Sequence, residues 1–347
     1  MTLKRDGRNM TGVHAARATG PPDGYPDGFL DDYDALRHGA GARLVERDVI
    51  ALSGPDARSY LQGQCSQDTD ALAVGGSADA LVLGPQGKVD ALVRVTRTGD
   101  DEFVLDVEGG FGAALAERLE RFKLRVKVTI DTLDWRCVAV RGPQSAPLAP
   151  ARDGSGVTVP GVQVAPAFSW NGVEGFDLLG EGPEIPAGVR PCSVEAWEAV
   201  GVEAGIPVMG SELDERTIPA EADLLERCVS FTKGCYTGQE LVARLDARGN
   251  KVARHLRGVV LDPSAGLSAG ATRGATVERD GKTVGTITSA AWSPSTGGVV
   301  ALAYVHRAVA PGDRVEVHPP DPSDAAAAPS HAATVQALPL EPPGHAG

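Results

Sequence analysis

The chain has 347 residues, enough for about two domains with a sizeable core. Its formal net charge of −13 disfavours binding to nucleic-acid phosphates, and no stretch reaches about 18 apolar residues without a charge or proline. The five cysteines are odd in number and never spaced as CxxC, which indicates reduced thiols rather than a disulfide framework or a metal site. These features predict a cytoplasmic protein that binds neither nucleic acid nor membrane.

Both ends of the chain are predicted to be poorly ordered tails. Residues 1–29 and 319–347 are rich in turn-forming or small residues, and such segments bury too little apolar surface to offset the entropy of ordering. Between the tails, short β-rich runs alternate with a few amphipathic helices, and no repeat of about 20–50 residues recurs. The pattern predicts an α+β protein whose connections are short enough for a monomer.

The central part, residues 30–254, is predicted to contain two α/β segments. The first, about residues 30–134, has β-rich runs at 42–45, 48–52, 80–84, 88–96, 102–107 and 124–128, and helices at 55–61 and 111–122. The second, about residues 135–254, is β-rich over 137–179, with a hairpin turn at Asn171-Gly172 between strands 162–170 and 175–179. A helix over 193–204 follows, and Gly205 and Pro207 are placed to end it.

A third region begins near Arg254, where the pattern becomes purely β. Short runs separated by turn signals predict a small closed barrel over 255–318. Its strands are expected at 256–261, 275–278, 283–288, 299–305 and 314–317.

The least ordinary stretch of the sequence is 230–244. Thr237 and Glu240 have the spacing of a capping box, which predicts a helix over 239–248. Cys235 would then lie near the positive end of that helix and two residues from Lys233, and both neighbours favour the thiolate. The alternative is that Cys235 is a small buried apolar residue in a tight turn.

The run Lys-Gly-Cys-Tyr-Thr-Gly-Gln-Glu at 233–240 resembles the signature of the YgfZ-type folate-binding proteins, relatives of the glycine-cleavage T-protein (aminomethyltransferase). The resemblance extends to 61–68, 203–207, 219–221 and 285–289, and covers roughly residues 33–318. It implies the T-protein fold, in which two α/β segments and a C-terminal small β-barrel surround a central channel that holds tetrahydrofolate. It also implies a role in the assembly or repair of iron–sulfur enzymes, with assembly proteins or client enzymes as partners.

The resemblance also assigns roles to individual residues. Cys235 becomes the functional thiol, and Glu203 becomes a hydrogen-bond acceptor for the pterin ring; its alternative is a surface carboxylate near a helix end. Lys233 would contact the folate glutamate tail or lower the pKa of the thiol. Tyr236, Gln239 and Arg244 are further cofactor-binding candidates; for Arg244, as for Arg248, a solvated basic face is an equal alternative. The tryptophans, Trp135, Trp170, Trp197 and Trp292, either line a pterin channel or pack in the core.

One departure from the T-protein separates two functions. The catalytic aspartate of that enzyme lies in an acidic pair after a glycine-rich turn, whereas residues 87–92 contain one acid, Asp90. Asp90 shares a strand face with Lys88 and Leu92, which predicts an exposed strand residue rather than a catalyst. The leading hypothesis is therefore a tetrahydrofolate-binding accessory protein for iron–sulfur enzymes rather than a conventional turnover enzyme. The alternative is a folate-dependent aminomethyltransferase or methyltransferase.

Overall fold

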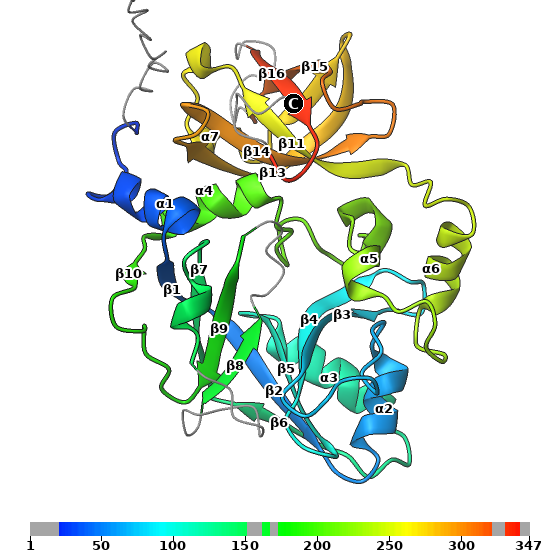
Figure 1. The fold of residues 1–347 in the computed structure, drawn as a ribbon. Helices are drawn as coiled ribbons and strands as arrows, with labels where there is room; N and C mark the ends of the chain where they lie inside the picture. Colours follow the sequence, from blue (N-terminus) through cyan, green and yellow to red (C-terminus); the bar gives the residue numbers. More distant parts are fainter. Residues whose placement is uncertain (1–20, 151–161, 167–172, 321–329, 341–347) are drawn as a thin grey trace, which may run out of the picture.

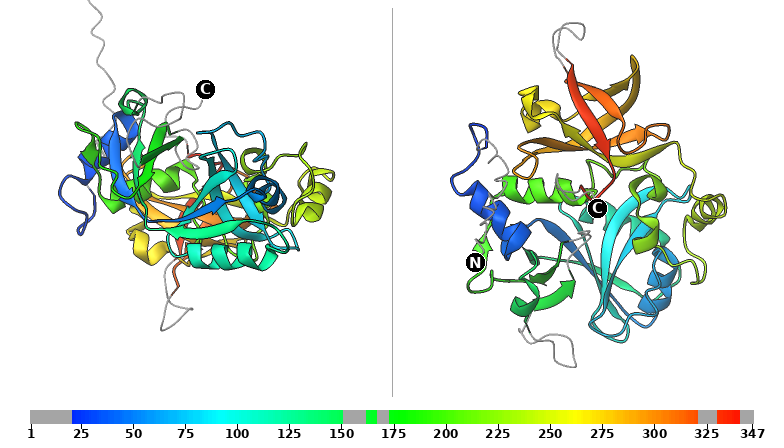
Figure 2. Two further views of the ribbon diagram at one scale, coloured as in Figure 1. Left: turned by 90° about the horizontal axis from the view of Figure 1, so that it is seen from below. Right: turned by 45° about the horizontal axis from the view of Figure 1, so that its top comes forward.

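The computed structural model describes residues 21–150, 162–166, 173–320 and 330–340. These form two mixed α/β parts and a barrel, which lies at the top of Figure 1 with the two sheets below it. The two views of Figure 2 show the same three parts. Among the described residues, no helix has the length and apolar character needed to cross a membrane.

The first sheet has the strand order β3-β4-β5-β2-β6 and is antiparallel throughout. Its elements are β2 (Arg47–Ser53), α2 (Ala57–Gln64), β3 (Ser77–Leu83), β4 (Val89–Arg97), β5 (Glu102–Glu108), α3 (Gly112–Phe122) and β6 (Thr129–Leu133). Leu115 and Leu119 of α3 are buried in the core of this part, as the helical spacing of apolar residues predicts. The strand predicted at 124–128 is wrong: Arg125 has a left-handed φ of 59°, and the strand forms at 129–133.

The second sheet has the order β10-β1-β7-β9-β8, and helices α1 and α4, which lie between it and the barrel in Figure 1, pack against each other and against the barrel. Its elements are α1 (Phe29–His38), β1 (Gly41–Val45), β7 (Arg136–Arg141), the 3-10 turn Ala146–Leu148, β8 (Val162–Pro166), β9 (Gly175–Gly180), β10 (Arg190–Pro191) and α4 (Val194–Ala204). Strands β8 and β9 pair antiparallel, while the predicted turn at Asn171-Gly172 lies outside the described residues. Gly205 ends α4 with a φ of 73°, as predicted.

The two predicted α/β segments are interleaved in space rather than consecutive. Strand β1 joins the second sheet although it lies in the first predicted segment. Conversely, residues after α4 pack on the first sheet, where Leu224, Cys228 and Val242 share a core with Leu81 and Leu83. This stretch contains the 3-10 turn Pro219–Ala222, α5 (Leu225–Cys228) and α6 (Gln239–Asp246).

The third part is a closed six-stranded barrel in the order β11-β14-β13-β12-β15-β16. Its elements are β11 (Arg254–Leu261), the 3-10 turn Pro263–Ala265, α7 (Ala269–Thr272), β12 (Thr276–Arg279), β13 (Lys282–Ser293), β14 (Gly298–His306), β15 (Arg314–His318) and β16 (His331–Gln336). The last strand corrects the prediction that the barrel ends at 318 and that a disordered tail follows. β16 pairs with both β11 and β15, and its Ala333 and Val335 are fully buried. At the other end, Tyr25 lies in the segment predicted to be a tail but packs edge-on against Phe29.

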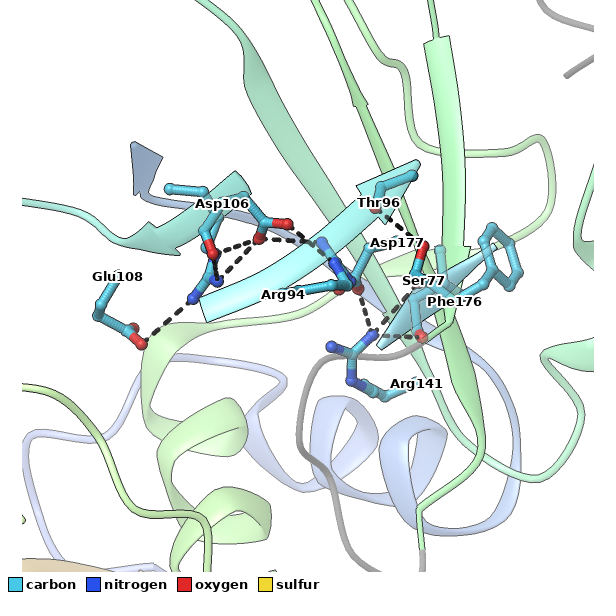
Figure 3. A network of polar contacts seen from close by, with 10 residues as sticks. Ser77, Arg94, Thr96, Asp106, Glu108, Arg141, Phe176 and Asp177 are labelled. Atoms are coloured by element: carbon cyan, nitrogen blue, oxygen red, sulfur yellow. Dashed lines mark hydrogen bonds and ion pairs between the residues drawn. The ribbon is translucent and has the colours of Figure 1, made fainter. Parts of the chain in front are cut away.

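A buried ionic network joins the two sheets (Figure 3). Arg94 of β4 donates to Asp106 of β5 at 2.9 Å and to Asp177 of β9 at 2.6 Å. Arg47 pairs with Asp106 and Arg141 pairs with Asp177, both at 2.6–2.8 Å. Burial alone would raise the pKa of Asp177, but Arg141 and Arg94 outweigh it and lower that pKa to about 2. Because each charge has a partner, the network fixes how the sheets meet without leaving an unpaired buried ion.

Candidate functional site

Residues 230–238, called the thiol loop below, pack on the C-terminal end of α2. The amide of Ser230 donates to the carbonyl of Ser66 at 3.0 Å, and the amide of Thr237 donates to the carbonyl of Gly63 at 3.2 Å. Just before the loop, the carbonyl of Cys228 accepts a 2.6 Å hydrogen bond from the Ser66 hydroxyl. Two stretches about 170 residues apart, both part of the family resemblance, therefore form one structural unit.

Lys233 is the centre of this contact. Its Nζ donates to the backbone carbonyls of Gln62, Cys65 and Gln67, each at 2.7 Å. These carbonyls lie at or just beyond the end of α2, where backbone acceptors lack helical partners. Burial lowers the pKa of Lys233. The ammonium has three protons and all three are used, so the structure does not support the prediction that Lys233 meets a folate tail.

Gly238 explains the next part of the motif. It is the N-cap of α6 with a φ of 83°, and a Cβ there would lie 2.6 Å from the carbonyl oxygen of Gly84 and 2.7 Å from the Leu83 Cβ. The predicted capping box between Thr237 and Glu240 is wrong, because Gly238 takes the cap position and no side chain caps the helix. The helix is also shorter than the predicted 239–248, since it ends at Asp246.

The side chains of Tyr236 and Gln239 shape the loop itself. Gln239 turns back, and its Oε1 accepts from the amide of Tyr236 at 3.3 Å. The Tyr236 ring packs against the core shared with the first sheet, and burial raises the pKa of its hydroxyl to about 12. The Lys233 ammonium lies 5.3 Å from the centre of this ring. Arg244 and Arg248, by contrast, are exposed, in keeping with a solvated basic face.

Cys235 is exposed on the thiol loop, whereas the other four cysteines are buried. Burial raises the pKa of Cys65 and of Cys228 to about 12 and that of Cys192 to about 11. The alternative that Cys235 is a buried apolar residue is therefore wrong. It is the cysteine that a reagent or partner can reach without unfolding the chain.

Asp90 is an exposed strand residue of β4, as predicted, although Leu92 on the same strand face is buried. Its carboxylate accepts from the Nε of Arg118 at 3.2 Å, and Arg118 also donates to Gln64 at 3.2 Å. The guanidinium stacks on the ring of Phe122, 3.7 Å from its centre. Asp90 is thus paired with an arginine that is itself buried.

Glu203 lies elsewhere, at the junction of α1, α4 and the barrel. It is 2% exposed, so it is not a surface carboxylate. Its oxygens accept from the Tyr33 hydroxyl at 2.8 and 2.9 Å, from Ser293 at 2.5 Å and from Ser295 at 3.1 Å. These three hydroxyls supply three protons to a carboxylate with about four acceptor positions, and the Arg37 guanidinium lies 3.7 Å from its Oε2, so most of its acceptor capacity is used within the protein. Glu203 belongs to the last turn of α4, which lies beside α1 in Figure 1, whereas α6, which follows the thiol loop, lies on the other side of the molecule.

A cavity that no sequence motif predicted lies between residues 211–217 and strands β13 and β14 of the barrel. This barrel pocket has a volume of about 790 Å³. The carboxylate of Glu212 is buried in its wall and accepts two hydrogen bonds, from the Ser289 hydroxyl at 2.6 Å and from the amide of Val208 at 3.0 Å. The Tyr304 hydroxyl donates to the backbone carbonyl of Glu212 at 2.9 Å.

Three basic side chains line the same pocket. They are Arg254, Lys282 and His306. Arg254 stacks over the Tyr304 ring at 4.2 Å and pairs with Glu221 at 3.1 Å. The acidic run at 212–215 is the local signal for this site, but its position against the barrel depends on contacts across 77 and 92 residues.

The three tryptophans that the structure describes pack in or against core clusters. Trp292 is buried, with its ring centre 6.0 Å from that of Tyr25, while Trp135 and Trp197 are partly buried at the edges of core clusters. Trp170 lies outside the described residues.

Comparison with known proteins agrees with this architecture. Residues 22–153 match the GCVT N-terminal domain, and residues 254–338 match the glycine cleavage T-protein C-terminal barrel domain. The chain is 30% identical to an uncharacterized protein of Haemophilus influenzae over 71% of this chain and 82% of that one. It is 27% identical to an aminomethyltransferase of Corynebacterium jeikeium over 83% and 86% of the two chains. The crystal structure of the glycine cleavage system aminomethyltransferase T from Bartonella henselae superimposes with a TM-score of 0.74 at 22% identity, covering 91% and 90% of the two chains, and confirms the predicted fold.

Proposed function

The chain belongs to the glycine-cleavage T-protein-like family, and from this premise we propose that it is a tetrahydrofolate-binding accessory protein of the YgfZ type. Its role is to support assembly or repair of iron–sulfur enzymes in the cytoplasm, acting as a monomer on assembly proteins or client enzymes. Cys235 supplies the functional thiol.

The barrel pocket suits a reduced folate better than the surroundings of Glu203. Its volume of about 790 Å³ is in the range of small-molecule sites, roughly 300–1,000 Å³. The Glu212 carboxylate has two of its acceptor positions occupied, so it retains capacity for the N–H donors of a pterin ring. Lys282 and His306 can pair with the carboxylates of a glutamate tail. When bound, the folate would supply a one-carbon carrier.

The observation that carries the accessory role is the exposure of Cys235 on a loop that is held at both ends. A free surface thiol is exposed to oxidation, and a flexible loop would not hold it toward a partner. Here the hydrogen bonds of Ser230, Lys233 and Thr237 to residues 62–67 fix the loop on a helix end. This arrangement holds the thiol at the surface, where a client protein can contact it.

A second candidate function is aminomethyl transfer. The Corynebacterium jeikeium aminomethyltransferase aligns with most of both chains, which favours this activity. Against it, the Asp90 carboxylate is already paired with the buried Arg118. Formation of methylene-tetrahydrofolate from an aminomethyl donor by the purified protein would support the second candidate, and lack of turnover at saturating folate would remove it.

The test of the accessory role is the activity of several iron–sulfur enzymes in cells that lack this protein. We expect wild type to restore activity, Cys235→Ala to fail, and Thr232→Ala to succeed, because Thr232 is exposed in the same loop but carries no thiol. Equal rescue by Cys235→Ala would show that the thiol is not needed for the accessory role. Unaffected enzymes in the deletion strain would remove the iron–sulfur role.

Folate binding needs a separate titration. Tetrahydrofolate should bind the purified protein, and Lys282→Gln should weaken binding several-fold because a charge-assisted hydrogen bond is lost. Lys251→Gln, which removes an exposed lysine outside the barrel pocket, is the matched control. Folded protein that binds no tetrahydrofolate would contradict the assignment of the barrel pocket.

A further inference from the structure

A second, smaller pocket lies where α5, the barrel strand β11 and the segment after β16 meet. Its volume is about 240 Å³, and its wall includes Asp223, Arg227, Leu256, Arg257, Pro311 and Leu338. We call it the arginine pocket. Arg254 and Arg257 are three positions apart on β11, so their side chains leave opposite faces of the strand. The arginine pocket is therefore separate from the barrel pocket, which Arg254 lines.

Arg257 is the unusual group in this wall. Its Nε is buried and has no hydrogen-bond partner among the described residues, and its Nη1 donates to the backbone carbonyl of Leu256 at 2.9 Å. Among the described residues, no carboxylate lies within ion-pair distance of the Arg257 guanidinium. The Asp223 carboxylate interacts with it electrostatically, but from a greater distance. A partly desolvated cation without a close counter-ion is costly, and the cost falls when an anion binds beside it.

Arg227 adds a second guanidinium to the same wall. It pairs with Asp79 at 3.3 Å, which orients it and balances its charge within the protein. The two guanidinium groups provide planar N–H donors of the kind that recognise carboxylate and phosphate oxygens. The negative charge of Asp223 repels a bound anion, but this side chain is exposed, so the solvent screens its charge.

The size of the pocket limits the ligand. At about 240 Å³ it lies below the range of sites for drug-sized molecules, yet it exceeds several times the roughly 30 Å³ that one water occupies. We propose that the arginine pocket binds one small oxyanion, either a phosphate or a carboxylate group. This site is independent of the proposed folate site and of Cys235.

The test is titration of the full chain with inorganic phosphate and, separately, with acetate, each against chloride at equal ionic strength, followed by thermal unfolding and by chemical shifts of the arginine side chains. We expect saturable binding of at least one anion. Arg257→Gln should weaken it about 10- to 100-fold, because charge-assisted hydrogen bonds are lost. Arg307→Gln, which changes an exposed arginine of the same barrel, should leave it unchanged.

A second variant keeps the test decisive if Arg257→Gln does not fold. Asp223 has a left-handed φ of 56°, a conformation that asparagine also tolerates, so Asp223→Asn should fold and bind the anion about threefold more tightly. Saturation by phosphate alone would identify a phosphate ligand, and saturation by acetate alone a carboxylate. Effects that chloride reproduces, or equal affinity in the wild type and Arg257→Gln, would overturn the proposal.

Discussion

Replacing Lys233 by methionine tests the structural role that the contacts give to this residue. Methionine keeps the length of the apolar stem but removes the ammonium that bonds the carbonyls of Gln62, Cys65 and Gln67. Each hydrogen bond from a charged donor contributes about 1.5–3 kcal/mol, and desolvation of the ammonium offsets part of the sum. We therefore expect the free energy of unfolding to fall by about 2–4 kcal/mol.

Urea unfolding measures this loss, with Lys251→Met as the control. Lys251 is exposed, so its replacement should change the free energy of unfolding by less than about 0.5 kcal/mol. Lys233→Arg should lower the free energy of unfolding by most of the same amount, because a planar guanidinium does not fit three carbonyls that converge on one point.

A second measurement shows which region the Lys233 substitution destabilises. Cys65 is fully buried and its carbonyl is one of the three acceptors, so local opening of this region should expose its thiol to reagent in a Cys235→Ala background. Reduced folate affinity with unchanged stability and an unreactive Cys65 would refute this reasoning and restore the predicted ligand role of Lys233.

The remaining predictions concern close packing, thiol access and pH. Gly238→Ala should cost about 2–4 kcal/mol of stability in urea unfolding, because its Cβ would meet a backbone oxygen at 2.6 Å in addition to the strain of positive φ; Gly249→Ala, with positive φ but open space, should cost about 1–2 kcal/mol, and equal losses would contradict the packing argument. In the native protein one thiol, that of Cys235, should react quickly with a thiol reagent, and fast labelling of Cys235→Ala would argue against this. The pKa of Asp177 is lowered to about 2, so its contribution to stability is present above about pH 4 and is lost as the pH falls through about 2; an NMR titration that finds an ordinary pKa of about 4 would contradict the network.

Much of the fold could be predicted because its signals are local. The apolar spacing of α3, the stop of α4 at Gly205 and the β periodicity from Arg254 onward each depend on a few neighbouring residues. Strand β16 was missed since His331–Gln336 follows an alanine- and proline-rich stretch, and its alternation of buried and exposed side chains becomes evident only against β11 and β15.

The candidate site was harder to predict because its contacts are distant in sequence. The motif marks Lys233, but the three carbonyls that it binds lie 166 to 171 residues earlier. In the same way, nothing near Glu203 indicates that Tyr33 and Ser293 will occupy its oxygens. Residue type shows what a side chain can do, whereas the fold determines which partner it meets.

The structure separates the residues of the 233–240 signature into those that build the loop and one that does not. Lys233 ties the loop to α2, Gly238 allows its close approach to the turn at Gly84, and Gln239 turns back to a backbone amide. None of these contacts involves the Cys235 side chain, which is exposed. An exposed free thiol adds nothing to packing and is open to oxidation, so its presence on such a constrained loop is better explained by chemistry than by folding. Variants of Lys233 and Gly238 should therefore lower stability and function together, whereas Cys235→Ala should lower function alone.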